Sequence, residues 1–273
     1  LVMKDHKLLE KEFQADGIKI NWHNMGTSPQ AARAMGSGSL DIAGNMNTAA
    51  LLMLNSEGLP VRVVTGTAHP TSNFAIVSKP GTELSVRDLK GKQVVGPKGT
   101  FLHQLLAAAL EKEGMKESDV QFINTGIPKA LSTILAGHAD AALVASSALI
   151  KANKAGAKTI INAERLVEPT LVMTTTKQFA EEHPDIVKRV DKVYAESLQW
   201  MKDHPAETAE MGAKEHGISI EDAKTLMERS HYFDKMTTKD LEDLKVNQKF
   251  LRDNGMMRNE VTVEELVLPV AME

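Results

Sequence analysis

Cysteine is absent from this chain of 273 residues, and its absence narrows the chemistry that the protein can perform. Thiolate is the reactive form of cysteine and a common metal ligand, so thiol catalysis and cysteine-ligated metal sites are excluded. A lack of cysteine also fits an exported protein that avoids stray disulfides.

Long apolar runs and basic clusters are missing as well. No apolar stretch reaches the roughly 20 residues that a membrane-spanning helix needs. The net charge is −4 without a long basic run, which argues against a nucleic-acid surface. No secretory signal pattern is present, so we expect either a cytosolic chain or a mature, processed one. Aromatic residues make up only 4%, but 42% of the chain is hydrophobic, which suffices for one large domain or two ordinary ones.

A repeat organises the first half of the chain. The segment 28–51 returns 99 positions later as 128–150, and the matches include a proline, a glycine and an aspartate at corresponding places: Pro29 and Pro128, Gly38 and Gly137, Asp41 and Asp140. Each copy has the pattern of a helix, a turn, a short apolar strand and a hydroxyl-bearing loop that opens the next helix. We interpret the copies as parts of two similar α/β lobes. The alternative is one doubly wound domain whose βα units are alike by chance.

The residues of the first copy predict its local structure. Ser28 can cap a helix that has Pro29 at its first position, and Gly38 can end that helix. Residues 40–44 are apolar enough for a buried parallel strand. Asn47 or Thr48 then caps a helix over 49–55. In the second copy, Ser146 or Ser147 is the corresponding cap.

Elsewhere the patterns predict alternating strands and helices, followed by a helical tail. We expect a helix over 1–15, a strand over 18–25, and further strands over 60–67, 74–78, 93–95, 120–124, 159–162 and 168–174. A helix over about 101–113 follows the third of these further strands, and the tail has helices at 177–203, 206–216, 219–230, 237–255 and 260–267. We therefore assign 1–77 and 171–273 to lobe 1, with the tail packed on it, and 78–170 to lobe 2. The two crossovers would form a two-strand hinge.

The strand-to-helix junctions predict an anion site. The first N–H groups of a helix lack intrahelical partners and carry partial positive charge, so they suit oxyanions. In two facing lobes, four such junctions would line one cleft, although each hydroxyl alone could be an ordinary helix cap. The residues expected to bind the ligand are Thr27, Ser28, Asn45, Asn47, Thr48, His69, Lys98, Thr100, Phe101, Ser146 and Ser147.

Other chemistries have little support in the sequence. Residues 96–100 (G-P-K-G-T) lack the spacing of a phosphate loop. His69 and His103 have no partner at metal-ligand spacing, so we predict neither a metal nor a cofactor. Asp41 and Asp140 suggest structural roles at the turn into each strand, where they would accept hydrogen bonds from loop N–H groups. No catalytic triad or acid pair is legible, so we predict no catalytic residue.

Four segments together resemble a known family: S-P-Q-A-A-R-A-M-G-S-G-S-L-D-I-A (28–43), D-L-K-G-K-Q-V-V-G-P-K-G-T (88–100), A-L-S-T-I-L-A-G-H-A-D-A-A (130–142) and K-Q-F-A-E-E-H-P-D-I-V (177–187). The sequence resembles the solute-binding proteins of ABC importers, in the aliphatic sulfonate, taurine and nitrate group. The resemblance implies an α/β, type II periplasmic-binding-protein fold with two lobes joined by a hinge.

The resemblance also implies a function. A monomeric, periplasmic or lipid-anchored receptor outside the cytoplasm would capture a small anion by hinge closure and pass it to a membrane permease. We expect a sulfonate such as taurine or an alkanesulfonate, and no enzymatic activity. Nitrate, bicarbonate or a thiamin-precursor pyrimidine on the same fold, an enzyme on this fold, and the effector domain of a transcription regulator remain alternatives.

Two features depart from the family's pattern. The family usually opens with a strand and a ligand-contacting loop that this sequence does not contain, which a shortened N-terminus would explain. The loop after the second repeat strand often carries an aromatic and an acidic residue, where this chain has Ala145 and Ser146. Ligand identity therefore does not transfer directly from relatives.

Overall fold

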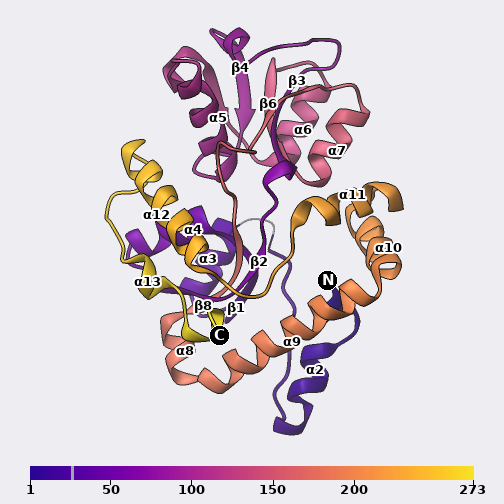
Figure 1. Ribbon diagram of the computed structural model, residues 1–273, viewed down its shortest axis with the longest axis vertical. Helices are drawn as coiled ribbons and strands as arrows, with labels where there is room; N and C mark the ends of the chain where they lie inside the picture. Colours follow the sequence, from indigo (N-terminus) through magenta and orange to yellow (C-terminus); the bar gives the residue numbers. More distant parts are fainter. Residues whose placement is uncertain (26–27) are drawn as a thin grey trace. The chain divides into compact units, whose positions relative to one another are not determined.

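The computed structural model describes residues 1–25 and 28–273, and it divides the chain into two compact units (Figure 1). Unit 1 comprises Leu1–Ala68, Thr170–Ile220 and Tyr232–Glu273, whereas unit 2 comprises His69–Pro169 and Glu221–His231. The sequence predicted crossovers near 77 and 171 and placed the whole tail in the first lobe. In the structure, one tail helix groups with unit 2 instead.

Unit 1 is built on a three-stranded sheet with β8 in the middle. β8 (Leu171–Thr176) pairs antiparallel with both β1 (Ile42–Asn47) and β2 (Val61–Ala68). The predicted parallel strand over 40–44 was therefore wrong in direction and began two residues too early. An apolar run indicates burial, but it carries no information about which distant strand becomes its partner.

Helices cover both faces of this sheet. Thr174 of β8 directs its hydroxyl to the sulfur atoms of Met35 and Met46, at 4.0 and 3.9 Å, on the face of α3 (Ser28–Gly36) and α4 (Thr48–Ser56). The next residue back, Met173, points to the other face because side chains alternate along a strand. There it joins Phe13 of α2 (Leu8–Phe13) and the apolar stripe of α9 (Pro184–Asp203), two helices that pack together (Figure 1).

The remaining elements of unit 1 are short helices and the rest of the tail: α1 (Val2–Asp5), η1 (Gln14–Asp16), α8 (Lys177–Glu182), α10 (Pro205–His216), α12 (Thr238–Asp253), α13 (Val263–Leu266) and η5 (Pro269–Ala271). The predicted helix over 1–15 is broken at Lys7, whose φ is 54°. The predicted helix over 177–203 is broken at His183, because Pro184 cannot continue a helix and instead opens α9.

The predicted strand over 18–25 does not form. Ile18 and Trp22 are 37% and 38% exposed, and the Trp22 indole N–H donates to Glu10 of α2 at 2.7 Å. Among the described residues, no strand pairs with this segment. Alternating apolar residues make a strand only where a neighbouring strand accepts their backbone hydrogen bonds.

Unit 2 has a five-stranded sheet whose order brings several strand ends to one edge. The order is β5-β4-β6-β3-β7, with β5 (Gln121–Asn124), β4 (Gln93–Gly96), β6 (Ala141–Ala145), β3 (Phe74–Ser78) and β7 (Thr159–Asn162). β4 is parallel to β5 and β6, whereas β3 is antiparallel to β6 and β7. The carboxyl ends of β4, β5 and β6 therefore share an edge with the start of β3.

The helices of unit 2 lie on both faces of its sheet. α6 (Ile127–Leu135) and α7 (Ser147–Lys154) cover one face, and α5 (Phe101–Lys112) lies on the other side of β4 (Figure 1). Three short turns complete the unit: η2 (Thr71–Asn73), η3 (Arg87–Leu89) and η4 (Glu117–Asp119). No helix in the described part of either unit is both long and apolar enough to span a bilayer.

The tail helix α11 (Ile220–Ser230) belongs to unit 2 in all but its first residue. Lys154 of α7 forms an ion pair with Asp222. The buried Asn73 amide donates to the Leu226 carbonyl and the Ser230 hydroxyl, each at 3.5 Å. These polar contacts explain why α11 packs in unit 2 although the other tail helices pack in unit 1. The periodicity of the sequence does not predict such contacts.

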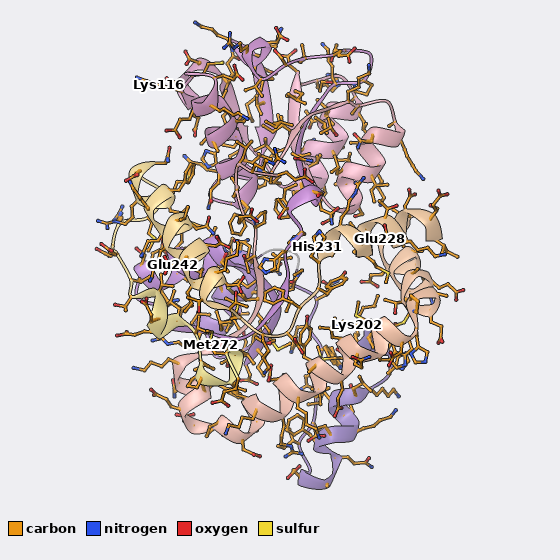
Figure 2. All side chains as sticks on the ribbon, viewed as in Figure 1. Lys116, Lys202, Glu228, His231, Glu242 and Met272 are labelled. Carbon is orange, nitrogen blue, oxygen red and sulfur yellow. The ribbon has the colours of Figure 1, made fainter. Side chains whose placement is uncertain are left out.

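After α11 the chain returns to unit 1 through a constrained segment. His231, labelled in Figure 2, has φ 43°, a conformation rare for a residue with a side chain. The Tyr194 hydroxyl then lies 3.2 Å from the Thr67 carbonyl and 3.0 Å from the Phe233 carbonyl. Burial raises the pKa of Tyr194, so the phenol stays a neutral donor there.

The predicted structural role of Asp140 is confirmed. Its Oδ2 accepts the N–H of Gln93 at 3.0 Å, at the point where β4 begins, and its Oδ1 lies 3.8 Å from the Lys79 ammonium. Asp41 acts differently, because its backbone carbonyl accepts the Thr175 hydroxyl at 2.8 Å.

Asp88 gives a test of local electrostatics in unit 2. The N–H and the hydroxyl of Ser85 both donate to Asp88 Oδ2 at 2.8 Å, and these two bonds hold the pKa of Asp88 below its usual value. The stability that they contribute is present above the unfolded pKa and is lost as the pH falls through the folded one. In Ser85→Ala, we expect the pKa of Asp88 to rise but to stay below normal, because the backbone bond remains. Carbon-13 titration of the Asp88 carboxyl measures this shift, and an unchanged pKa would contradict it.

Candidate anion-binding site

The start of α4 in unit 1 gathers several of the predicted ligand residues. Asn47, one of the two caps that the sequence allowed, is the N-cap, and its Oδ1 accepts the N–H of Ala50 at 2.8 Å. The N–H of Thr48 donates to the Thr170 carbonyl at 3.1 Å, which ties the start of the helix to the chain entering β8. Asn47 and Thr48 are therefore held rigidly by the surrounding backbone.

Ser28 lies beside Asn47 although the two residues open different helices. Its hydroxyl oxygen accepts hydrogen bonds from the N–H and the side-chain amide of Asn47, at 3.4 and 3.2 Å. The helix begins at Ser28 itself, so the prediction that this residue caps it was wrong. Because the oxygen accepts both bonds, the hydroxyl proton of Ser28 remains able to donate to a ligand.

Thr48 contributes a buried hydroxyl without a partner. Its side chain is 0% exposed, and no other described residue accepts or donates a hydrogen bond at its Oγ1. A buried polar group in this state costs stability, so it commonly marks a place where a ligand or water completes the bonding. The free donors of Ser28 and Thr48 thus meet the positive end of α4.

Thr67, at the end of β2, extends this group although the sequence gave no sign of it. Its hydroxyl donates to the Asn45 Oδ1 at 3.1 Å, which fixes the orientation of the Asn45 amide and leaves its NH₂ pointing away from Thr67. Threonine is common in strands, so only the fold reveals this role. The group of Ser28, Asn45, Asn47, Thr48 and Thr67, hereafter the α4 site, contains only neutral side chains.

The shared edge of unit 2 collects a second set of predicted residues. Thr100 caps α5, since its Oγ1 is positioned to accept the His103 N–H, and its hydroxyl donates to the Pro97 carbonyl at 2.9 Å. The Lys98 side chain is exposed. Phe101 is almost fully buried and packs edge-to-face on Phe74, with ring centroids 6.4 Å apart. Phe101 is therefore packed into the core of unit 2, and its contact with a ligand stays a prediction.

Ser146 and Ser147 do not cap α7 as predicted. Ser146 occupies the N-cap position, but its side chain makes no capping hydrogen bond and its backbone has φ 54° and ψ −126°. The close pairing of β6 with β3 explains this strained conformation, because the Ser146 N–H donates to the Asn73 carbonyl at 2.8 Å. Ser147 is the first residue of α7.

Two predicted residues lie outside these groups. Thr27 is not among the residues that the structure describes. His69 is the first residue of unit 2, and its N–H donates to the Ser230 carbonyl at 2.9 Å, so its backbone anchors the end of α11. Within 1–25 and 28–273, no cluster of three histidine or acidic side chains could hold a metal ion.

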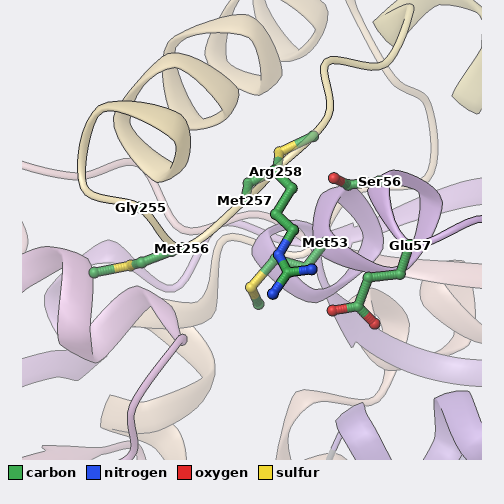
Figure 3. Close-up of a pocket in the computed structure, with 7 residues that line it drawn as sticks. All are labelled: Met53, Ser56, Glu57, Gly255, Met256, Met257 and Arg258. Atoms are coloured by element: carbon green, nitrogen blue, oxygen red, sulfur yellow. The ribbon is translucent and has the colours of Figure 1, made fainter.

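A separate hollow of about 310 Å³ lies at the opposite end of α4 (Figure 3). It is lined by Met53, Ser56, Glu57, Gly255, Met256, Met257 and Arg258. Arg258 extends toward the end of the helix, with its guanidinium beside Met53 (Figure 3). The carboxyl end of a helix carries partial negative charge, so Arg258 complements it, and an anion is favoured at the other end.

Comparisons with known proteins identify the family of the chain. A family model described as NMT1/THI5 like matches residues 12–208. The chain is 29% identical over 187 residues to a taurine-binding periplasmic protein of Escherichia coli, covering 67% of this chain and 58% of that protein. It is 26% identical over 216 residues to a putative aliphatic sulfonates-binding protein of Bacillus subtilis, covering 77% and 64%. The chain thus spans less than two thirds of either relative.

A solved structure shows the same fold. The periplasmic aliphatic sulphonate binding protein SsuA from Escherichia coli matches with a TM-score of 0.86 at 19% identity, covering 100% of this chain and 89% of that one. The predicted α/β periplasmic-binding-protein fold is confirmed, as is the resemblance to the sulfonate and taurine group.

Proposed function

Because the chain belongs to the NMT1/THI5-like family, we propose that it is a solute-binding protein of an ABC importer. It captures a small organic anion outside the cytoplasm and delivers it to a membrane permease. A sulfonate is the preferred ligand, since relatives bear the names of taurine and aliphatic sulfonates. We propose binding rather than catalysis, because the hydroxyls of the α4 site have no histidine, lysine or carboxylate within the site that could activate them as nucleophiles.

The single observation that carries the proposal is the buried, unpartnered hydroxyl of Thr48 at the start of α4. A sulfonate oxygen would accept this proton together with that of Ser28, and the helix end stabilises the negative charge. Neutral donors suffice because a sulfonate remains ionised throughout the biological pH range. Binding should therefore depend little on pH between about 5 and 8, where the α4 site has no group that titrates.

The ligand class is tested by thermal denaturation of the purified protein. The panel contains taurine, ethanesulfonate, butanesulfonate, nitrate, bicarbonate and a hydroxymethylpyrimidine. A ligand present at about 100 times its Kd stabilises the fold by roughly 2.7 kcal/mol. A shift with a sulfonate supports the proposal, whereas a shift with the pyrimidine alone overturns the ligand class. Ligand-induced closure of the two units and a monomeric state stay predictions, which small-angle scattering with and without ligand tests.

Thr48→Val tests the α4 site directly. Valine has nearly the shape of threonine but no hydroxyl, so the free protein should be unchanged or up to about 1 kcal/mol more stable. Ethanesulfonate affinity, measured by calorimetry, should fall at least tenfold because one donor is lost. Thr225→Val on α11 is the matched control, since the Thr225 hydroxyl donates to the Glu221 carbonyl of its own helix. Equal affinities of Thr48→Val and the control would exclude Thr48 from the site.

A further inference from the structure

His103 has a role in unit 2 that neither metal binding nor ordinary core packing explains. Its side chain is 1% exposed, one turn into α5 and beneath the loop 97–100. The ring stacks on Phe122 of β5, with centroids 4.7 Å apart and planes 26° from parallel. Both ring nitrogens have polar partners, so burial of the imidazole is compensated on each side.

The two hydrogen bonds define the tautomer of His103. The N–H of Gly99 donates to Nδ1 at 3.1 Å, which requires that Nδ1 carry no proton. The proton is therefore on Nε2, which lies 2.6 Å from the Glu117 carboxylate in η4. Glu117 thus selects the tautomer that can accept from Gly99.

The hydrogen bond from Gly99 to His103 is one of three that hold the loop 97–100 in place. The Lys98 N–H donates to the Asn124 side chain at 2.9 Å, and the Thr100 hydroxyl donates to the Pro97 carbonyl at 2.9 Å. Gly99 between them has φ 70°, and within the described residues its N–H donates to His103 alone. Without the imidazole, the residue with the greatest backbone freedom in the loop would lose its anchor.

The same turn of α5 offers a donor that lacks an acceptor. Gln104 is 1% exposed, and its Nε2 has no hydrogen-bond partner among the residues described. The first N–H groups of α5 also lack intrahelical partners by the geometry of a helix. Gln104 lies in the first turn of α5, and side chains of a helix lean toward its amino end, so this unpaired amide favours an anion at the start of the helix.

We propose that His103 is a positioning residue for anion binding in unit 2. It holds Gly99, and with it the loop 97–100, in the shape that presents the start of α5 to a sulfonate, and Glu117 sets the tautomer that makes this possible. The inference rests on the proposed function for its ligand. Its structural half, the control of Gly99 by His103, is independent of the ligand.

Two substitutions separate the two sides of the ring. In His103→Asn, the amide lies where Nδ1 was and can still accept from Gly99, but contact with Glu117 is lost. In His103→Gln, the amide reaches the place of Nε2 and keeps Glu117, but Gly99 loses its acceptor. We expect His103→Gln to weaken ethanesulfonate binding at least tenfold and to speed Gly99 amide exchange at least tenfold. His103→Asn should stay within threefold of the wild type in ethanesulfonate affinity and in Gly99 amide exchange. The Tm should fall in each of the two variants.

A purely structural role predicts a different result, namely that affinity follows Tm in both variants alike. That result, or unchanged Gly99 exchange in His103→Gln, overturns the proposal. Glu117→Ala provides a milder variant, because Glu117 is 42% exposed and its loss need not unfold the core. It should raise Gly99 exchange by about threefold. If the wild type binds no sulfonate, the proposed function fails, and Gly99 exchange alone decides the role of His103.

Discussion

Gly66→Ala is expected to destabilise the protein by about 3 kcal/mol, at the upper end of the usual cost of overpacking a core. A Cβ at Gly66 would lie 2.0 Å from a ring carbon of Phe233, and two more ring carbons are within 2.8 Å. The ring cannot withdraw easily, because the Phe233 N–H donates to the Thr67 carbonyl and the Tyr194 hydroxyl holds the Phe233 carbonyl. Urea denaturation of the whole protein measures the loss in the free energy of unfolding.

Two further variants isolate the cause. Gly44→Ala, in β1 of the same sheet, places its methyl group where no atom lies within 4 Å, so its effect should stay below about 1 kcal/mol. The double variant Gly66→Ala/Phe233→Ala should lose less stability than the sum of the two single losses, because the second change removes the obstructing ring. Similar losses in the Gly66 and Gly44 variants, or an additive double variant, would disprove the steric explanation.

Asn47→Asp is expected to abolish most sulfonate binding while leaving the fold intact. Aspartate is as good an N-cap as asparagine and adds a favourable interaction with the helix end, so stability should be equal or slightly higher. The new carboxylate repels the ligand and also accepts the Ser28 proton that the ligand would use. Two unit charges about 4 Å apart near a protein surface interact by about 4 kcal/mol, so a loss of at least 100-fold in affinity is expected.

The measurement pairs calorimetry with thermal denaturation. Gln14→Glu serves as the control, because it adds the same charge at an exposed position of unit 1 and should leave affinity within twofold. An affinity for ethanesulfonate that is unchanged in Asn47→Asp would show that the anion binds away from the start of α4. A parallel fall in stability and affinity would instead indicate that the helix itself has been damaged.

Capping and alternation patterns predicted the elements that depend on neighbouring residues. The cap of α4 by Asn47 and the start of α5 after Thr100 follow from side chains that bond to backbone two or three positions away. The fold class was also predictable, because the repeat and the family motifs extend over most of the chain.

Contacts between distant segments could not be predicted in the same way. The direction of β1 depends on β8, which is more than a hundred residues away, and the segment 18–25 stays irregular although its alternation is that of a strand. Ser146 fails as a cap because its backbone N–H is drawn to the carbonyl of Asn73 in η2, just before β3. Thr67 and Gln104 entered the candidate sites only because the fold brings the Thr67 hydroxyl to Asn45 and leaves the buried Gln104 amide without a partner among the described residues.

The central place of β8 determines the order in which the two sheets can be completed during synthesis. β1 and β2 do not pair with each other, and their common partner leaves the ribosome only after every strand of unit 2. The sheet of unit 2 can therefore assemble while both early strands of unit 1 still expose unpaired backbone edges. In a nascent chain, these edges are where mispairing and aggregation would begin, so chaperone dependence should concentrate on 42–68.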